Sequence, residues 1–166
     1  MKIAQIQMRV TSDKTENLRR AAALIRQAAP ADMAVLPEMF CCPYDNSCFR
    51  AYGEPAGGAA YQMLSRAARE LGLWLVGGSL PELDDGRVYN TSFVFDPQGT
   101  CVARHRKMHL FDIDVEGGQR FRESDTLSPG DDVTLFDTPW GRMGLCICFD
   151  LRFEELCRVM ALEGAR

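Results

Sequence analysis

The first third of the chain alternates strand-like and helix-like patterns, and this alternation limits the possible folds more than any other feature. Residues 2–8 alternate apolar and polar side chains, as a strand does, and residues 33–38 form a second short apolar run that ends in a carboxylate. Between them, a Thr11–Asp13 start signal precedes apolar residues at helical spacing up to Pro30. Because a strand–helix–strand unit favours parallel strands in one sheet, this opening predicts an α/β fold.

The rest of the chain continues with strands joined by turns and closes on a helix. A helix is expected over residues 58–71, where apolar residues form one stripe and Gly72 stops the pattern. Further strand patterns lie at residues 73–80, 88–95, 100–109, 133–138 and 143–148, and the last helix pattern lies at 152–162. Residues 39–56 and 110–131 are expected to be irregular. Together these patterns predict a mixed sheet with helices on one side.

Length and composition restrict the class of protein. A chain of 166 residues with 46% hydrophobic and 25% charged residues suits a single domain over residues 1–166. The net charge of -4 provides no basic surface for nucleic acid, and no apolar run is long enough to span a membrane. Seven cysteines occur without the apolar core of a signal peptide at the amino terminus. We therefore expect reduced thiols in a cytoplasmic protein without nucleic-acid or membrane partners.

A thiol lies at the junction of the last strand and the last helix. The apolar run from Met143 ends in Cys148, and Asp150 follows as a possible helix cap. A cysteine in this place lies near the positive end of the helix dipole, which favours the thiolate over the thiol. The alternative is that Cys146 and Cys148 are two small buried hydrophobic residues of a strand.

Two carboxylates and a basic run are further candidates for a site. Glu38 lies at the carboxyl end of a strand, where open α/β sheets form their ligand crevice, although most glutamates are solvent-exposed. In the run 104–109, a strand would place Lys107 and the two histidines on one face. A charged, solvated edge strand would have the same pattern. Glu123 lies in the long irregular stretch and is the second carboxylate candidate.

The sequence offers soft metal ligands and possible bases, but their spacing does not form a known motif. Five of the cysteines could join His105 and His109 around zinc, yet they match neither C-x2-C pairs nor an H-x3-H unit on a helix, so no metal is expected. Glycine-rich phosphate-binding motifs are absent from the sequence. A Cys–His hydrolase with either histidine as the base remains an open alternative.

Three segments together resemble a known family. Leu36–Phe40, Arg106–Asp112 and Cys148–Phe153 occur in the order and at the spacing of the motifs of the nitrilase superfamily of carbon–nitrogen hydrolases. The family uses a Glu–Lys–Cys triad. The resemblance implies that Glu38 is the general base, Lys107 the oxyanion-stabilising cation and Cys148 the nucleophile.

Supporting roles follow from the same resemblance and from the position of the thiol. Glu123 resembles the additional active-site carboxylate of the family. The backbone N–H of Phe149, directly after the nucleophile, is a candidate second oxyanion donor. Phe149 stands where relatives often carry tyrosine. No metal or organic cofactor is required by this chemistry.

Further segments are most similar to the ω-amidase branch of the superfamily. They are Cys42–Tyr44, His109–Val115 and Thr126–Gly130. This similarity implies hydrolysis of the amide bond of short dicarboxylic ω-amides, such as 2-oxoglutaramate or 2-oxosuccinamate, through a thioester and with release of ammonia. Tyr44 is then expected to contribute to the substrate pocket.

The resemblance also implies an architecture and a partner. Family members form an α-β-β-α sandwich with mixed sheets, of which this chain would supply about the N-terminal three-fifths, and the full-length form is expected to be a homodimer. Three hypotheses therefore follow from the sequence. The chain is an amidase with an intact catalytic constellation, or a truncated, inactive form that serves as a partner or dimerisation module, or a thiol- or metal-binding protein.

Overall fold

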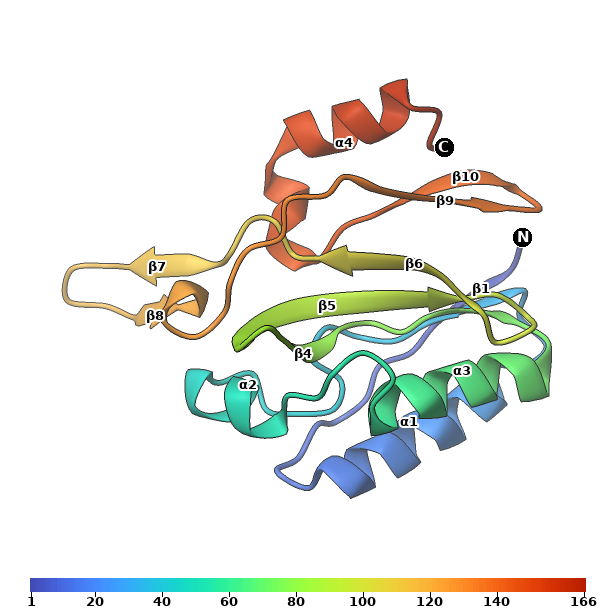
Figure 1. Ribbon diagram of the computed structural model, residues 1–166, viewed down its shortest axis with the longest axis horizontal. Helices are drawn as coiled ribbons and strands as arrows, with labels where there is room; N and C mark the ends of the chain where they lie inside the picture. Colours follow the sequence, from blue (N-terminus) through green and yellow to red (C-terminus); the bar gives the residue numbers. More distant parts are fainter.

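Two helices cover one face of a six-stranded mixed sheet in the computed structural model, which describes residues 1–166 (Figure 1). The sheet has the order β1-β2-β3-β5-β4, and β6 pairs with β5. Its strands are β1 (Ile3–Gln5), β2 (Met33–Val35), β3 (Trp74–Val76), β4 (Leu80–Asp84), β5 (Arg87–Phe95) and β6 (Cys101–Arg106). The covering helices are α1 (Lys14–Ala28) and α3 (Ala59–Leu71). None of the helices combines the length and the apolar character that a membrane crossing requires.

A second β layer and a further helix lie on the opposite face of the sheet (Figure 1). The antiparallel pair β9 (Thr134–Thr138) and β10 (Gly141–Leu145) forms this layer, and α4 (Glu154–Leu162) lies beyond it. The two β layers share a buried cluster of Met33, Trp74, Val94, Phe136 and Leu145. This order of layers confirms the α-β-β-α arrangement. The strand and helix patterns alone predicted helices on one side only, and α4 on the opposite side shows that this prediction was wrong.

The predicted strand–helix–strand opening is confirmed. β1 pairs with β2, and β2 with β3, both in parallel. Asp13 caps α1 by accepting the N–H of Glu16 at 3.0 Å. α1 and α3 bury Ile25 and Leu64 in the main core beneath the sheet. α3 ends at Gly72, whose φ of +63° places it in the left-handed region.

The structure corrects the expectations for residues 39–56 and 73–80, which lie before and after α3 in the chain. The segment 39–56 is not a plain loop, because Asp45 accepts the N–H of Ser47 and caps the short helix α2 (Asn46–Tyr52). The expected strand over 73–80 is interrupted after β3. Gly78 has φ +57°, and a Cβ there would lie 2.1 Å from the carbonyl oxygen of Pro37. The close approach of two backbones therefore ends the strand.

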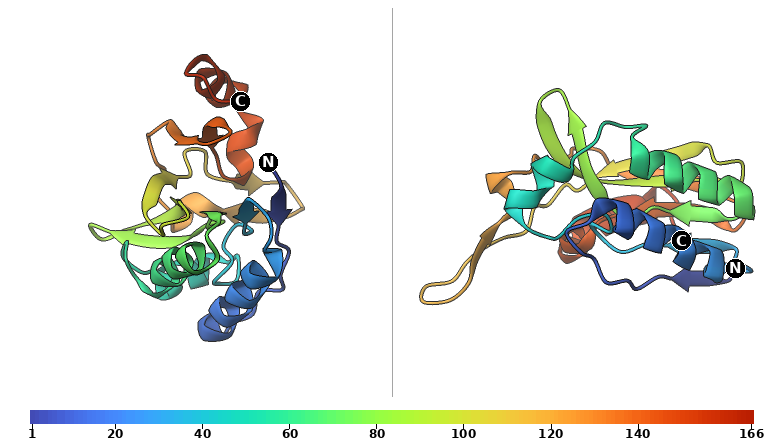
Figure 2. Two further views of the ribbon diagram at one scale, coloured as in Figure 1. Left: turned by 90° about the vertical axis from the view of Figure 1, so that its right-hand side faces the viewer. Right: turned by 90° about the horizontal axis from the view of Figure 1, so that it is seen from below.

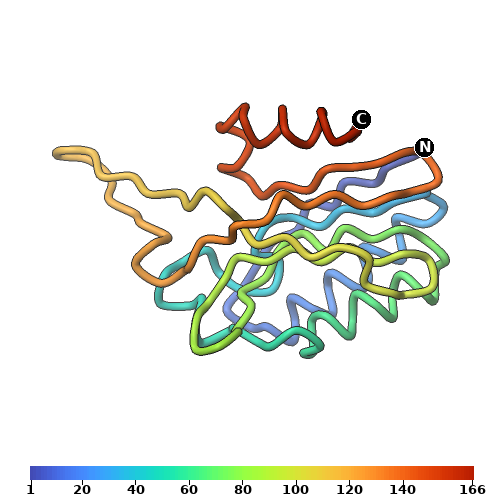
Figure 3. Tube along the Cα trace, turned by 45° about the horizontal axis from the view of Figure 1, so that its top comes forward, coloured from blue at the N-terminus to red at the C-terminus, as the bar shows by residue number.

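The stretch 110–131 also contains regular structure. β7 (Asp112–Asp114) and β8 (Arg120–Arg122) form an antiparallel hairpin that projects from the layers, as Figures 2 and 3 show. Its turn contains Gly117 at φ +70°. A 3-10 turn, η1 (Glu123–Asp125), follows at once.

The last helix begins later than its pattern predicted. The segment after β10 forms the 3-10 turn η2 (Cys148–Arg152), and α4 begins only at Glu154. Asp150, expected to be a helix cap, instead accepts the N–H of Ile147 at the start of η2. The side chain of Cys148 therefore does not lie at the first turn of the α-helix.

Candidate active site

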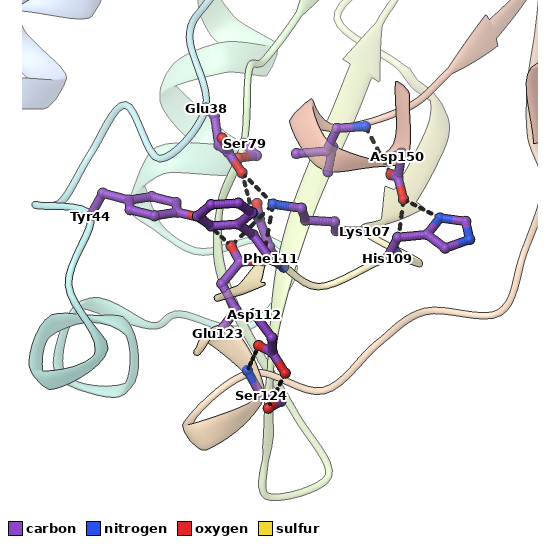
Figure 4. Close-up of polar contacts among 12 residues, drawn as sticks. Glu38, Tyr44, Ser79, Lys107, His109, Phe111, Asp112, Glu123, Ser124 and Asp150 are labelled. Carbon is purple, nitrogen blue, oxygen red and sulfur yellow. Dashed lines mark hydrogen bonds and ion pairs between the residues drawn. The ribbon is translucent and has the colours of Figure 1, made fainter. Parts of the chain in front are cut away.

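Side chains from four separate segments converge at one end of the sheet. Glu38 follows β2, Lys107 follows β6, Glu123 lies in η1 and Cys148 begins η2. The Nζ atom of Lys107 lies 3.0 Å from Oε1 of Glu38 and 3.0 Å from Oε2 of Glu123 (Figure 4). The side chains of Lys107 and Glu123 have no exposed surface. The sequence-predicted residues are thus brought together, with one ammonium between two carboxylates.

The charge of Lys107 is maintained by its neighbours. Burial lowers the pKa of its ammonium, but the negative charges of Glu38 and Glu123, with their hydrogen bonds, outweigh burial and raise the pKa. The backbone of Lys107 is fixed by two strand-like bonds, from its N–H to the carbonyl of Asn90 and from the N–H of Gly130 to its own carbonyl, each of 2.9 Å. The ammonium is therefore charged at neutral pH and held in one place.

Glu38 is held by a tight contact between two loops. Its neighbour Met39 has φ +49° and donates its N–H to Oγ of Ser79 at 3.0 Å. The side-chain amide of Asn90 donates to Oε1 of Glu38 at 2.8 Å. One carboxylate oxygen of Glu38 is thus engaged by Asn90 and Lys107, while Oε2 makes no bond within the protein.

Glu123 is fully buried and accepts bonds from three directions. Besides Lys107, it accepts the hydroxyl of Tyr44 and the backbone N–H of Phe111, each at 2.6 Å. Burial, followed by the bond to Glu123, raises the pKa of Tyr44, so its hydroxyl stays protonated and donates. Tyr44 also stacks on Phe121, with ring centroids 5.3 Å apart. Tyr44 therefore positions Glu123 as well as facing the pocket.

Cys148 is a strained, exposed residue whose thiol faces Glu38. Its φ of +47° is rare outside glycine. Partial desolvation raises the pKa of Cys148, the negative charge of the nearby Glu38 raises it further, and Lys107 opposes them. The helix-dipole argument for a lowered pKa does not apply, because no α-helix begins at this residue and a carboxylate lies beside it. The structure instead places the thiol beside the carboxyl group of Glu38.

The carboxylate of Asp150 joins the segment of Cys148 to the segment of Lys107. Asp150 is fully buried, and its Oδ1 accepts the backbone N–H of Met108 at 3.2 Å. The same oxygen accepts the backbone N–H of His109 at 2.9 Å (Figure 4). The ring nitrogens of His105 and His109 lie 3.1 Å and 2.9 Å from its two oxygens. Both histidines thus form hydrogen bonds with Asp150. A Cys–His hydrolase would need a hydrogen bond between a histidine and the thiol, and neither histidine forms one.

Burial opposes ionisation of Asp150, but its bonds from His105, Ile147 and His109 lower the pKa to about 2, from an ordinary value of 3.8. The ionised form therefore stabilises the fold at neutral pH, and this contribution is lost as the pH falls below about 4 toward 2. Replacing Asp150 by asparagine is expected to lower the free energy of unfolding by about 2–5 kcal/mol near neutral pH, because an acceptor becomes a donor among buried donors.

Urea unfolding over a range of pH measures this effect, with Asp131→Asn, at an exposed position, as the control. The difference between wild type and Asp150→Asn should narrow by about 2 kcal/mol as the pH falls from about 5 to about 2.5. A difference that stays constant over this range would contradict the assignment of the lowered pKa to Asp150.

A pocket of about 730 Å³ opens in front of the thiol. Its lining residues are Glu38, Tyr44, Phe111, Cys148, Phe149, Leu151 and Arg152. Arg152 is the one cation in this lining and makes no ion pair within the chain. Sequence reasoning missed Arg152, although it lies in the segment that carried the family resemblance.

The cysteines and histidines do not gather into a metal-binding arrangement. All seven thiols are free, and no group of three or more His, Cys, Asp or Glu side chains has a geometry that could hold a metal ion. The interpretation of Cys146 as a buried strand residue is wrong, because β10 ends at Leu145 and Cys146 is only half-buried.

Comparison with known proteins agrees with the geometry. Residues 2–166 match the family model described as carbon-nitrogen hydrolase. The chain is 50% identical to omega-amidase NIT2 of Bos taurus and 48% identical to that of Homo sapiens, in each case over 99% of this chain and 60% of the relative. The crystal structure of Saccharomyces cerevisiae Nit3, a member of branch 10 of the nitrilase superfamily, is 40% identical and has a TM-score of 0.88, covering 99% of this chain and 61% of that one. The chain thus spans about 60% of the length of the curated relatives it matches, and it belongs to the carbon–nitrogen hydrolase family.

Proposed function

We propose that the chain carries the catalytic residues of an amidase that cleaves a carbon–nitrogen bond through a thioester on Cys148. The observation that carries this proposal is the buried ammonium of Lys107, held between Glu38 and Glu123 beside a thiol that faces Glu38. A thiol with an adjacent base and a fixed cation is the arrangement that nucleophilic attack on an amide carbonyl requires.

In the acylation step, Oε2 of Glu38 accepts the thiol proton as the sulfur of Cys148 attacks the amide carbon. The carbonyl oxygen becomes an oxyanion, which Lys107 and the backbone N–H of Phe149 stabilise. Glu38 then returns the proton to the amide nitrogen, the carbon–nitrogen bond breaks and ammonia leaves. The acyl group remains on the sulfur as a thioester.

In the second step, water hydrolyses the thioester. Glu38 accepts a proton from the water as its oxygen bonds to the acyl carbon, and the carbon–sulfur bond breaks. The proton returns to the sulfur, so both Glu38 and Cys148 regain their starting states. Glu123 keeps Lys107 charged and in place in both steps, since it contacts the ammonium directly.

We further propose that the substrate is a short amide with a distal carboxylate, such as 2-oxoglutaramate or 2-oxosuccinamate. The relatives named omega-amidase support this class. The pocket supports it independently, because the guanidinium of Arg152 has no partner in the chain and lines the same cavity as Cys148. A guanidinium binds a carboxylate through two parallel hydrogen bonds.

Intact-mass spectrometry and ammonia release with these two amides test the proposal. A transient acyl adduct on Cys148 is expected. Replacing Arg152 by methionine should raise KM for the carboxylated amides by about 10–100-fold, which matches the loss of one charge-assisted pair. A monoamide without the carboxylate should show no such change and serves as the control.

An adduct on another cysteine would overturn the assignment of the nucleophile. A folded chain that forms no adduct with any of the amides would instead favour the inactive partner or dimerisation module. The homodimer and the cytoplasmic location inferred from the sequence stay predictions.

A further inference from the structure

A second, smaller cavity adjoins Glu38 and Cys148. It has a volume of about 120 Å³. Its lining residues are Val35, Leu36, Glu38, Val76, Gly78, Ser79, Ser92, Leu145, Cys146, Ile147 and Cys148. Glu38 and Cys148 are the two residues that line both cavities. The reacting pair therefore borders both a large chamber and a small one.

One residue that lines the small chamber has a buried polar atom without a partner. Ser92 on β5 is 1% exposed, and its Oγ atom makes no hydrogen bond within the chain. Ser79 also lines the chamber, but its Oγ already accepts the N–H of Met39. A buried hydroxyl that lacks a hydrogen bond is costly, and buried water commonly supplies the missing bond.

Ser92 lies on the same face of its strand as a residue that contacts the proposed general base, Glu38. Side chains alternate across a strand, so Ser92 lies on the same face of β5 as Asn90, whose amide donates to Glu38 at 2.8 Å. The Oδ1 atom of Asn90 is likewise buried and unpartnered. The rest of the wall is largely apolar, which limits the number of places where a small polar molecule can bind.

We propose that the small chamber binds the water molecule that hydrolyses the thioester, with Ser92 as its anchor. This inference rests on the proposed function. During the second step the acyl group occupies the large pocket, and the small chamber offers water a further approach beside Glu38 and Cys148. The cavity has room for water, and Ser92, Glu38 and Cys148 all line it, so a water bound there lies beside both reacting groups.

The chemistry of the step is balanced within these residues. The bound water donates one proton to Oε2 of Glu38 and forms a bond from its oxygen to the acyl carbon. The tetrahedral intermediate collapses, the carbon–sulfur bond breaks and the sulfur recovers the proton from Glu38. Ser92 touches only the water, and it has no part in the first attack by Cys148.

Two substitutions of Ser92 separate this role from the first step. Ser92→Ala removes the anchor, and Ser92→Val also fills part of the chamber. With 2-oxoglutaramate, rapid-quench mass spectrometry should show the adduct on Cys148 forming at the wild-type rate in both variants. The adduct should persist about 10-fold longer in Ser92→Ala and about 100-fold longer in Ser92→Val, since misplacing a reactant by about 1 Å has effects of that size.

The control is Ser65→Ala, which removes a half-buried hydroxyl from α3 on the helical side of the sheet. It should form and lose the adduct at wild-type rates. Thermal unfolding of all four proteins identifies any variant that fails to fold. A high-resolution crystal structure adds an independent measurement, a water within about 3.2 Å of Oγ of Ser92.

Unchanged adduct lifetimes in both Ser92 variants would overturn the proposal while leaving the proposed function intact. If the wild-type chain forms no adduct, the proposed function fails. The crystal structure then tests the water site by itself. An empty chamber at Ser92 overturns the water site, and an ordered water there supports it.

Discussion

Replacing Cys148 by alanine is expected to reduce ammonia release from 2-oxoglutaramate by about 10⁴-fold or more, because every step of the proposed reaction passes through its sulfur. The substitution removes an exposed sulfur, so the fold should be retained. Alanine at φ +47° keeps the strain that the native residue already bears. The loss should therefore be in the rate, with little change in the free energy of unfolding.

Cys157→Ala is the matched control for this prediction, since Cys157 is also an exposed thiol but lies on α4. It should leave ammonia release and the mass of the adduct unchanged. Ammonia release by Cys148→Ala at the wild-type rate would contradict the assignment of the nucleophile.

Replacing Lys107 by methionine is expected to reduce both activity and stability. The rate should fall by about 100–1,000-fold, as it does when an oxyanion donor is lost. The free energy of unfolding should fall by about 3–5 kcal/mol, because the substitution leaves Glu123 buried and ionised without its cation. Steady-state ammonia release and urea unfolding measure the two effects.

A double variant separates the two losses. Adding Glu123→Gln to Lys107→Met removes the uncompensated buried charge, so much of the stability should return. Activity should stay low, because the cation that faces the oxyanion is still missing. Recovery of activity in the double variant would contradict the role of Lys107, and an undiminished stability of the single variant would contradict the buried ion pair.

The local parts of the fold were predictable from the sequence. The strand–helix–strand opening, the caps of α1 and α3, and the pairing of β9 with β10 depend on periodicity and on turn residues close in the chain. The break at Gly78 was not predictable in this way. It arises from the backbone of Pro37, which belongs to a different strand connection.

The same division holds for the site. The sequence brought Glu38, Lys107 and Cys148 together only through the resemblance to a family, and the structure places them at one end of the sheet. The helix-dipole argument for a lowered pKa of the thiol fails, because that pKa depends on desolvation and on Glu38, which is remote in sequence. Asp150 and Arg152 lie within the recognised segment, but their contacts depend on tertiary packing that no local pattern encodes.

The ion pair of Lys107 with Glu38 joins residues 69 positions apart. The hydrogen bond that the N–H of Met108 donates to Asp150 joins residues 42 positions apart. Contacts of such sequence separation form only after the chain has closed long loops. A partly folded chain that holds α1, α3 and the first strands thus has none of the geometry needed for catalysis. Covalent labelling of Cys148 by an amide substrate would therefore report completion of folding, in the way that a ligand binding only the native state does.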